Sequence, residues 1–458
     1  MNSVAKATAT EALARFAWGL RFEDLPGSVV RKLKESLLDT IGISAFAAMY
    51  ADSSKSFRAA VRSLGGEGPS TVIGEARGYP SPQAALLNGA YAHTLDFDDT
   101  NLVGSLHPGA SVIAAALATA EEADTDGRTL LVALAAGYEV TCRVGAALGP
   151  TTYDRGFHIT AVAGIFGAVA AAAKIRNTKF DAILNAFGLA GSRAAGSMQY
   201  LENGAWNKRL HPGFSAHDAL IVLAFAEAGV MGAAAPIEGG RGFLNAYSAD
   251  ARPERLTAAL GEEWVLLETA IKPYPSCRFA HAAIDLALEL REKAPDAGRA
   301  RASLTLKLPR TAMQIVAGAE ENKIRPRNVV EAQFSVYFQV AAAWLDGRYD
   351  WGSYDRIGAS DVDSLAASIE TVLDESIPFA GAELIARVDG TIVRGRAELP
   401  LGEPSHPMSW QALEGKFQSM TGPVFGPDRP ALLAARLREI DKEPSIASFM
   451  SEFRATAT

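Results

Sequence analysis

The chain contains few cysteines. Among its 458 residues only Cys142 and Cys277 are present, and neither lies in a CxxC pair. Two thiols cannot ligate a four-iron cluster, which argues against dehydration chemistry of the aconitase, iron–sulfur type. They also provide neither a disulfide framework nor a CxxC zinc pattern.

An excess of basic residues is missing too. The chain has 44 Lys and Arg against 52 Asp and Glu, which gives a formal net charge of −8. It has no basic stripe with interleaved aromatic residues, so we expect no nucleic-acid partner. The acidic balance does not exclude an anionic substrate, because local basic groups can dominate the potential of a cleft.

Long apolar runs are absent. The longest, residues 159–173, is short and rich in alanine and glycine, so it predicts a buried helix and no interaction with a membrane. The N-terminal segment carries Lys6, Glu11 and Arg15 and lacks the apolar core of a signal peptide. We therefore expect a cytoplasmic protein.

Several well-known catalytic motifs do not occur. The glycine-containing stretches at 65–70 and 229–232 match neither the dinucleotide-binding pattern nor the P-loop. The chain also has no GxSxG elbow and no HExxH helix. Nucleotide-dependent chemistry, serine hydrolysis and zinc proteolysis of these types are therefore not indicated.

The chain does contain a long series of predicted helices, from its start to about residue 265. Alanine-rich stretches at 110–122, 130–148, 161–174 and 219–229 are too densely apolar for one-sided surface helices. Their small side chains let helix backbones approach closely. This length can hold a large core and two domains or more.

The pattern changes near residue 270. Ala302–Leu308 alternates polar and apolar residues like a half-buried strand. Ala382–Leu399 predicts two strands around an Asp389-Gly390 turn, and Val329–Leu345, between these segments, predicts a helix. We predict a mainly α fold with three parts: a helical domain at 1–268, a smaller α/β domain at 269–402, and C-terminal helices at 403–458 that return to the helical domain.

Six of the seven histidines lie between residues 93 and 281, in four short segments dense with other chemical groups. Histidine exchanges a proton near neutral pH, so this grouping predicts a proton-transfer site assembled from distant parts of one fold. The segments read HTLDFDDTNLVGSLHP from His93, DRGFHIT around His158, NKRLHPGFSAHD from Asn207 and KPYPSCRFAH ending at His281.

The first segment places three carboxylates beside histidines. Asp96, Asp98 and Asp99 could ligate a divalent metal or orient a catalytic base; the alternative is helix capping on a solvated turn. The HPG sequence that starts at His107 predicts a loop entering a helix, where free N–H groups favour an anion. We expect no metal here.

The second and third segments are basic. His158 precedes an apolar helix and is a candidate for anion contact, the alternative being a cap or a core residue. Lys208 and His211 are three residues apart and share a face if this segment is helical. A lysine partly desolvated beside other cations has a lowered pKa and can act as base or acid; the alternative is a solvated basic face.

The fourth segment combines Lys272, Cys277, Arg278 and His281. Cys277 has no second thiol evidently paired with it, so a two-cysteine racemase mechanism is unsupported. The four segments together suit a site that needs neither metal nor cofactor. In such a site a proton is abstracted next to a carboxylate, and cations stabilise the enolate-like intermediate.

Taken together, these segments resemble the MmgE/PrpD family, which includes 2-methylcitrate dehydratases, cis-aconitate decarboxylases and iminodisuccinate epimerases. The resemblance spans nearly the whole chain and includes LLDTIGISAFAA (Leu37–Ala48), RGFHITAVAGIFGAVAAAAK, KRLHPGFSAHDAL and GEPSHPMSWQALEGKF. It implies a large all-helical domain, a smaller α/β lid domain, a site between them, a homodimer, and cofactor-free chemistry on di- and tricarboxylates. The RGFH and KRLHPGF sequences follow the decarboxylase and epimerase pattern more than the dehydratase pattern.

The resemblance also suggests roles for individual residues. Within the decarboxylase branch, the site residues correspond to Asp96, Thr100, His107, His158, Lys208 and His281. We expect Lys208 and His158 or His107 to be the opposed acid and base, with Asp96 orienting the base. Thr100, His211, Lys272 and Arg278 are expected to bind substrate. His281 is expected to be catalytic and also to contact a carboxylate of the substrate.

Our first interpretation is an epimerase acting on iminodisuccinate or a similar compound. It would invert a stereocentre by removing a proton from one face and returning one to the other. Lyase alternatives are a cis-aconitate decarboxylase and a 2-methylcitrate dehydratase, which need the same cationic pocket. A different class would be a carboxylate-binding protein on a degenerate enzyme fold, and the intact set of site residues argues against it.

Overall fold

The computed structural model describes residues 7–202, 204–318 and 320–455, and the chain divides into two compact units. The first, called here the helical unit, consists of Met1–Ile271 and Ser409–Thr458. The second, the α/β unit, is Lys272–Met408. The predicted fold class, mainly helical with a smaller α/β part, is confirmed.

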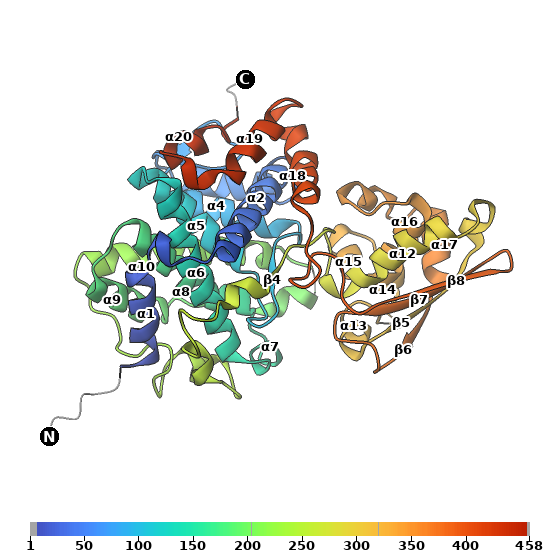
Figure 1. Cartoon of the computed structure of the whole chain (residues 1–458), viewed down its shortest axis with the longest axis horizontal. Coiled ribbons are helices and arrows are strands. Elements are labelled where there is room, and N and C mark those ends of the chain that lie inside the picture. The colour runs from blue at the N-terminus through green and yellow to red at the C-terminus, as the bar shows by residue number, and fades with distance from the viewer. Residues whose placement is uncertain (1–6, 203, 319, 456–458) are drawn as a thin grey trace. The chain divides into compact units, whose positions relative to one another are not determined.

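The helical unit is built around helices that are buried on nearly all sides (Figure 1). In its described part the α-helices are α1 (Ala9–Gly19), α2 (Gly27–Tyr50), α3 (Ser54–Ser63), α4 (Ser81–Thr94), α5 (Pro108–Ala123), α6 (Gly127–Leu148), α7 (Thr151–Asp154), α8 (Ile159–Ile175), α9 (Phe180–Ala190), α10 (Asn207–Glu227), α11 (Phe243–Tyr247), α18 (Trp410–Phe425), α19 (Arg429–Arg438) and α20 (Ile446–Ser451). α8 packs against α5, α6 and α10, and α10 packs against α4. The densely apolar stretches predicted as buried helices are therefore core helices.

Two glycines allow α4 and α10 to approach closely. A Cβ atom added to Gly89 would lie 2.9 Å from the Cα atom of Gly213, and one added to Gly213 would lie 2.3 Å from the carbonyl oxygen of Leu86. Real Cβ atoms do not come this close, so larger residues would push the helices apart. This contact sets α4, which carries His93, beside α10, which carries Lys208 and His211.

α6 is long and apolar enough to cross a membrane by length and composition. Its apolar window is 94% buried within the protein, however, and it begins at an Asp126 cap whose side chain accepts a hydrogen bond from the Thr129 N–H. These properties are those of a core helix.

Short strands complete the helical unit. β1 (Ser70–Thr71) pairs antiparallel with β2 (Gly78–Tyr79). β3 (Thr100–Asn101) pairs antiparallel with β4 (Thr269–Ala270), so Thr100 lies opposite Ala270. The second pair ties the segment after α4 to the end of the unit's first stretch of chain.

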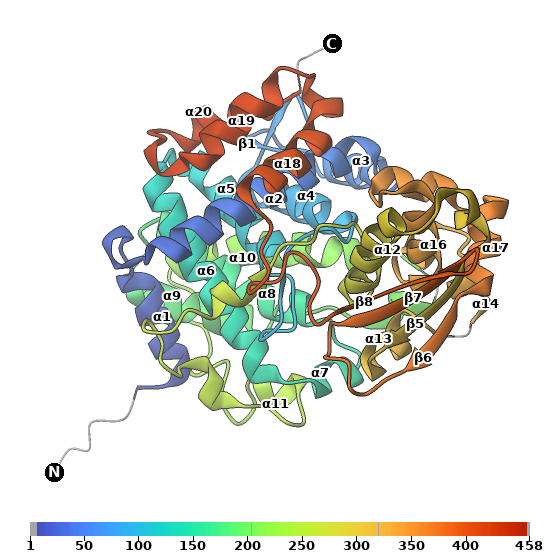
Figure 2. The same ribbon diagram turned by 45° about the vertical axis from the view of Figure 1, so that its right-hand side comes forward.

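The α/β unit contains a four-stranded sheet in the order β6-β5-β7-β8 (Figure 2). Its strands are β5 (Ser303–Leu308), β6 (Glu370–Leu373), β7 (Ala382–Val388) and β8 (Thr391–Ala397), with β5 and β6 parallel and the other pairs antiparallel. Its α-helices among the described residues are α12 (His281–Lys293), α13 (Arg310–Ile315), α14 (Glu321–Ile324), α15 (Val329–Gln333), α16 (Val336–Asp346) and α17 (Ser360–Ser368). α12 packs on β7 and β8, and α16 packs on α12.

The two strand patterns read from the sequence are confirmed. In β5 the side chains of Leu304, Leu306 and Leu308 are buried while those between them are not. β7 and β8 form a hairpin in which Val388 pairs with Thr391. The two turn residues, Asp389 and Gly390, both have positive φ, as a type I′ hairpin turn requires.

The single helix predicted over Val329–Leu345 is wrong in one respect, because the structure has two helices there. α15 ends at Gln333, and α16 begins after Ser335, whose side chain accepts a hydrogen bond from the Phe338 N–H. Serine at this position caps a new helix instead of continuing the old one.

Candidate active site

Four helix ends meet around the histidines of the helical unit. His93 is one residue before the end of α4, His107 and His158 immediately precede α5 and α8, and Lys208 lies in the first turn of α10. The His93 ring lies 4.7 Å from that of His107 and 5.6 Å from that of His158, centre to centre. A helix N-terminus carries free N–H groups and a partial positive charge, so three such ends beside one another favour an anion.

These side chains form one group, called here the histidine cluster: His93, Asp96, Asp98, His107, His158, Tyr200, Lys208 and His211. Most of it is buried, and Lys208 keeps 18% of its side chain exposed. Five residues of the predicted catalytic and substrate-binding set belong to it, and so does Asp98, which was named as a possible metal ligand or orienting carboxylate. His93 lay in the first segment but had no role assigned, and Tyr200 was missed.

Lys208 forms an ion pair with Asp96. Its Nζ atom donates a hydrogen bond of 2.8 Å to Asp96 Oδ1, joining positions 112 residues apart. Burial lowers the pKa of Lys208, but the charge of Asp96 and this hydrogen bond outweigh burial, and the pKa is raised overall. The prediction of a lowered lysine pKa is therefore wrong. Lys208 stays protonated at neutral pH and is a poor base.

Asp98 holds two of the histidines. His93 Nδ1 lies 2.7 Å from Asp98 Oδ2, and His107 Nδ1 lies 3.2 Å from the same oxygen. Burial raises the pKa of Asp98, yet the two imidazoles together lower it well below its ordinary value. Asp98 is therefore a carboxylate that accepts a hydrogen bond from the His93 Nδ1–H.

His158 and His211 face each other. Their Nδ1 atoms are 3.1 Å apart, and each ring meets the Tyr200 ring edge-on. Burial, followed by the charges of neighbouring groups that include Lys208, lowers the pKa of His158 well below its ordinary value and that of His211 to about 4. Both rings are therefore neutral near pH 7, so that one Nδ1 donates and the other accepts.

Asp99, the residue after Asp98, is held by hydrogen bonds at the start of α5. It accepts hydrogen bonds from the Tyr138 hydroxyl at 2.7 Å and from the Gly109 N–H at 3.0 Å. Burial raises the pKa of Asp99 to about 7, although the Tyr138 hydrogen bond opposes the shift. Asp99 thereby satisfies one N–H at the start of α5, directly after His107. Asp98 and Asp99 are fully buried, so the solvated turn of the alternative is wrong for both, whereas its helix capping is confirmed for Asp99.

Three residues of the cluster have the composition of a metal site. His93, Asp98 and His107 each offer one ligand atom, and these atoms lie within 4.8 Å of one another. Two imidazoles and one carboxylate suit a divalent transition metal. Hydrogen bonding of Asp98 to the imidazoles accounts for the same geometry, and the absence of a metal stays a prediction.

Thr100 lies four residues after Asp96, in β3. Its hydroxyl is buried and has no hydrogen-bond partner among the residues that the structure describes. Its role in substrate binding stays a prediction.

The other predicted site residues belong to the α/β unit. Lys272 and Arg278 are buried, and Arg278 forms an ion pair with Glu403. His281 begins α12; its Nε2 lies 3.1 Å from the carbonyl oxygen of Ser276, and its ring meets that of Tyr274 edge-on. Because Glu403 balances the charge of Arg278, this guanidinium attracts a substrate carboxylate less strongly than the sequence alone suggests.

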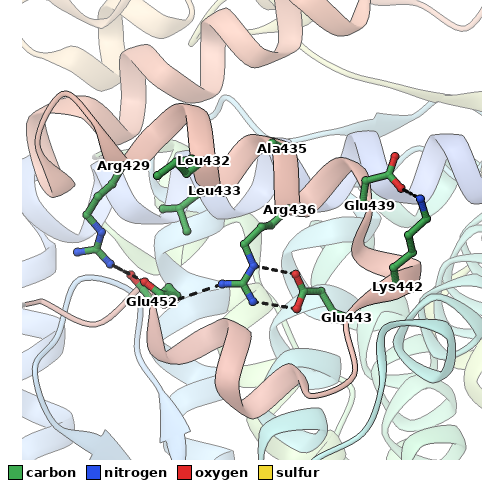
Figure 3. A pocket seen from close by; sticks show the side chains of 9 residues that line it. All are labelled: Arg429, Leu432, Leu433, Ala435, Arg436, Glu439, Lys442, Glu443 and Glu452. Carbon is green, nitrogen blue, oxygen red and sulfur yellow. Dashed lines mark hydrogen bonds and ion pairs between the residues drawn. The ribbon is translucent and has the colours of Figure 1, made fainter.

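A separate hollow of about 590 Å³ lies among the C-terminal helices (Figure 3). We call it the α19 hollow; its lining residues are Arg429, Leu432, Leu433, Ala435, Arg436, Glu439, Lys442, Glu443 and Glu452. Arg436 binds Glu443 through two hydrogen bonds of 2.7 and 2.8 Å, Arg429 pairs with Glu452, and Lys442 pairs with Glu439. Its cations are matched by carboxylates, so it does not attract an anion as the histidine cluster does.

A buried acid/base cluster in a helical unit, joined in sequence to an α/β unit, defines the class of this protein. The MmgE/PrpD N-terminal domain matches residues 11–256 and the MmgE/PrpD C-terminal domain matches residues 274–439. The chain belongs to the MmgE/PrpD family of enzymes.

Several similar proteins are named for the decarboxylation of cis-aconitate. Cis-aconitate decarboxylase-like protein oryM from Aspergillus oryzae is 30% identical over 311 residues, which is 64% of either chain. Cis-aconitate decarboxylase from Aspergillus terreus is 25% identical over 98% of this chain and 96% of its own length. The Mus musculus protein of that name is 25% identical over 90% and 86%. These similarities favour our lyase alternative over the epimerase.

Proposed function

We propose that the chain is a cofactor-independent lyase that removes carbon dioxide from cis-aconitate or a closely similar tricarboxylate. The observation that carries the proposal is the Lys208–Asp96 ion pair inside the histidine cluster, where three helix N-termini meet. The names of the relatives support the choice of decarboxylation among the reactions that such a site can perform.

The reaction needs a cation and an acid. Loss of CO₂ from the CH₂ carboxylate of cis-aconitate breaks one C–C bond. The electron pair of the broken bond forms a new C=C double bond. The π electrons of the original C=C bond move to the carbon beside the far carboxylate. That carbon then takes one proton, and the product is itaconate. Negative charge therefore grows next to a carboxylate, where fixed cations and N–H groups stabilise it.

Lys208 supplies the cation in this proposal. Its raised pKa keeps it charged over the whole physiological range, and Asp96 fixes its position. Of the two neutral rings, one uses its N–H in the His158–His211 hydrogen bond, and the other keeps an Nε2–H that it can donate to the substrate without adding charge. Preorganised groups of this kind are worth more in a buried site than in water.

His107 is our choice for the proton donor. It keeps 14% of its side chain exposed, so a substrate can reach it, and its Nδ1 lies beside the carboxylate of Asp98. A carboxylate at this distance stabilises the imidazolium that must give up the proton. An acid placed in this way contributes about 10²–10⁴ in rate.

The test is proton NMR of the purified protein with cis-aconitate in D₂O. We expect the two alkene protons of itaconate to appear, with one deuterium in the CH₂ next to the far carboxylate. Parallel samples contain iminodisuccinate and 2-methylcitrate. Deuterium entering iminodisuccinate with no lyase product would instead establish the epimerase, and an alkene from 2-methylcitrate alone would establish the dehydratase.

A further inference from the structure

A lysine from the C-terminal part of the chain is buried below the segment that carries Asp96 and Asp98. Lys416 lies in α18, which packs against α2 (Figures 1 and 2). The helices are close because α2 has Gly42 at the contact: a Cβ atom there would lie 3.0 Å from Cδ2 of Phe417. This places Lys416, the residue before Phe417, against Asp39 of α2.

The ammonium group of Lys416 contacts Asp39 and Phe97. Its Nζ atom is 2.5 Å from Asp39 Oδ1 and donates a hydrogen bond of 3.2 Å to the carbonyl oxygen of Phe97. It also lies 3.5 Å from the centre of the Phe97 ring, which is a cation–π contact. Lys416 and Asp39 are both buried, so these interactions are formed away from bulk water.

Phe97 stands between the two carboxylates that organise the histidine cluster. Asp96 on one side holds Lys208, and Asp98 on the other contacts His93 and His107. The backbone of Asp96 has a φ of 52°, in the sparsely populated left-handed region. Such a conformation persists where surrounding contacts hold it, and Lys416 supplies contacts to both the carbonyl and the ring of the next residue.

We propose that Lys416, held by Asp39, is a positioning residue for the reaction assigned above, and this rests on the proposed function. It fixes the segment 95–99 so that Asp96 meets Lys208 while Asp98 meets the imidazoles. It acts only through Phe97 and touches no reacting atom. The C-terminal helices thus complete the active site of the helical unit through one buried ammonium group.

The test replaces both charges at once. Changing Lys416 alone to an apolar residue would leave Asp39 buried without this cation, which destabilises a fold. The K416M/D39N variant removes the pair and leaves no excess charge. If it does not fold, as judged by circular dichroism, K416R takes its place, because it keeps the charge while its planar guanidinium cannot reproduce the ammonium position over Phe97.

A matched control exists in the same two parts of the chain. Lys34 of α2 forms an ion pair with Asp441 and donates to the carbonyl oxygen of Arg438, so it also ties α2 to the C-terminal segment. Among the residues that the structure describes, neither Lys34 nor Asp441 forms an ion pair or hydrogen bond with segment 95–99. The K34M/D441N variant therefore loses an ion pair between the same two parts of the chain, one that is more exposed than Lys416–Asp39 and does not contact Phe97.

Two readouts are needed. The first is kcat and KM for cis-aconitate: we expect kcat of K416M/D39N to fall about tenfold or more, with KM changed less than threefold, and the control to match the wild type. The second uses protein labelled with ¹⁵N-histidine, in which the ring nitrogens of His93 and His107 report their contacts with Asp98. We expect these signals to shift in K416M/D39N and not in K34M/D441N.

A smaller fall in kcat than tenfold, or unchanged histidine signals, overturns the positioning role. If the wild type makes no itaconate, the proposed decarboxylase function fails, and the histidine signals alone then decide the positioning role. Shifted signals in K416M/D39N would support it, and signals equal to those of the control would overturn it.

Discussion

Two groups of charged side chains in the helical unit differ mainly in burial. The α19 hollow pairs arginines and a lysine with glutamates at the surface, and Arg436 keeps 36% of its side chain exposed. The histidine cluster holds the same kinds of charge, but Asp98 is fully buried. Water screens the first group, so its pairs are weak. In the second group each charge alters the protonation of its neighbours, and this makes acid/base chemistry possible.

The largest effect is expected from removing the central cation. In K208M, Asp96 loses its ion pair with Lys208, and the negative charge that grows in the reaction loses the ammonium group that stabilises it. We expect kcat/KM for cis-aconitate to fall about 10³-fold. K442M in the α19 hollow is the matched control, because Lys442 is also paired with a carboxylate. A loss of less than tenfold in K208M would contradict the role of Lys208.

Replacing Asp98 by asparagine sharpens the comparison further. The D98N side chain has nearly the same shape, but it carries no charge to stabilise an imidazolium at His107. We expect kcat to fall about 10²-fold while KM changes little. E443Q, which removes a carboxylate from the α19 hollow, should keep the wild-type kcat. Equal effects of the two substitutions would show that burial does not distinguish the groups.

Stability should depend on pH through buried carboxyl groups. Burial raises the pKa of Asp99 to about 7 and that of Glu121, which accepts hydrogen bonds from Thr71, also to about 7. Each folded carboxyl keeps its proton between about pH 4 and pH 7, where the unfolded chain has lost it. The free energy of unfolding therefore falls as pH rises through this window, by about 1 kcal/mol per pH unit for each group.

This pH dependence is measured by urea unfolding between pH 5 and pH 8. D99N and E121Q should each reduce the slope below pH 7, whereas E443Q should leave it as in the wild type. A slope that neither D99N nor E121Q changes would show that these groups do not hold protons in the folded state.

A small effect is expected from breaking a pair in the α19 hollow. Arg436 and Glu443 are partly exposed and solvent screens their attraction. R436M should lower the free energy of unfolding by about 0.2–1 kcal/mol and leave kcat unchanged. Urea unfolding and the itaconate assay check the two parts, and a loss of several kcal/mol would contradict the assignment to weak surface pairs.

The smallest effect is expected from a chelator. If Asp98 serves the imidazoles of His93 and His107 as a hydrogen-bond acceptor, EDTA followed by dialysis leaves kcat within twofold of its starting value. Metal analysis of the active protein provides the second measurement. Activity that is lost with EDTA and restored by one divalent metal would show that these three residues bind that metal.

Local patterns carried much of the fold. The alternation in Ala302–Leu308 and the Asp389-Gly390 turn were enough to predict β5 and the β7–β8 hairpin, because register and turn geometry depend on neighbours in sequence. The apolar density of α5, α6 and α8 was enough to predict buried helices. The break before Ser335 was missed, because the sequence does not distinguish a serine that caps a new helix from one inside a continuous helix.

The candidate site was less accessible to such reasoning. Asp96, His107, His158, Lys208 and His211 were identifiable as reactive side chains in motif segments, and the structure places them in one cluster. Tyr200 had no such signal, because it lies outside the four segments. It belongs to the cluster because the preceding segment, 196–198, forms backbone hydrogen bonds with Gly156–His158. His93 lay within a segment, and its spacing of five residues from Asp98 was the available sign.

The sequence by itself determined the family, the helical character of the larger unit and the types of side chain available for chemistry. Tertiary structure decided their protonation. Lys208 has neighbouring cations in sequence, which suggested a lowered pKa, but in the fold it pairs with Asp96, 112 residues away, and the pKa is raised. The physical reason is that a pKa depends on burial and on charges within a few ångströms, and only the folded chain sets those distances.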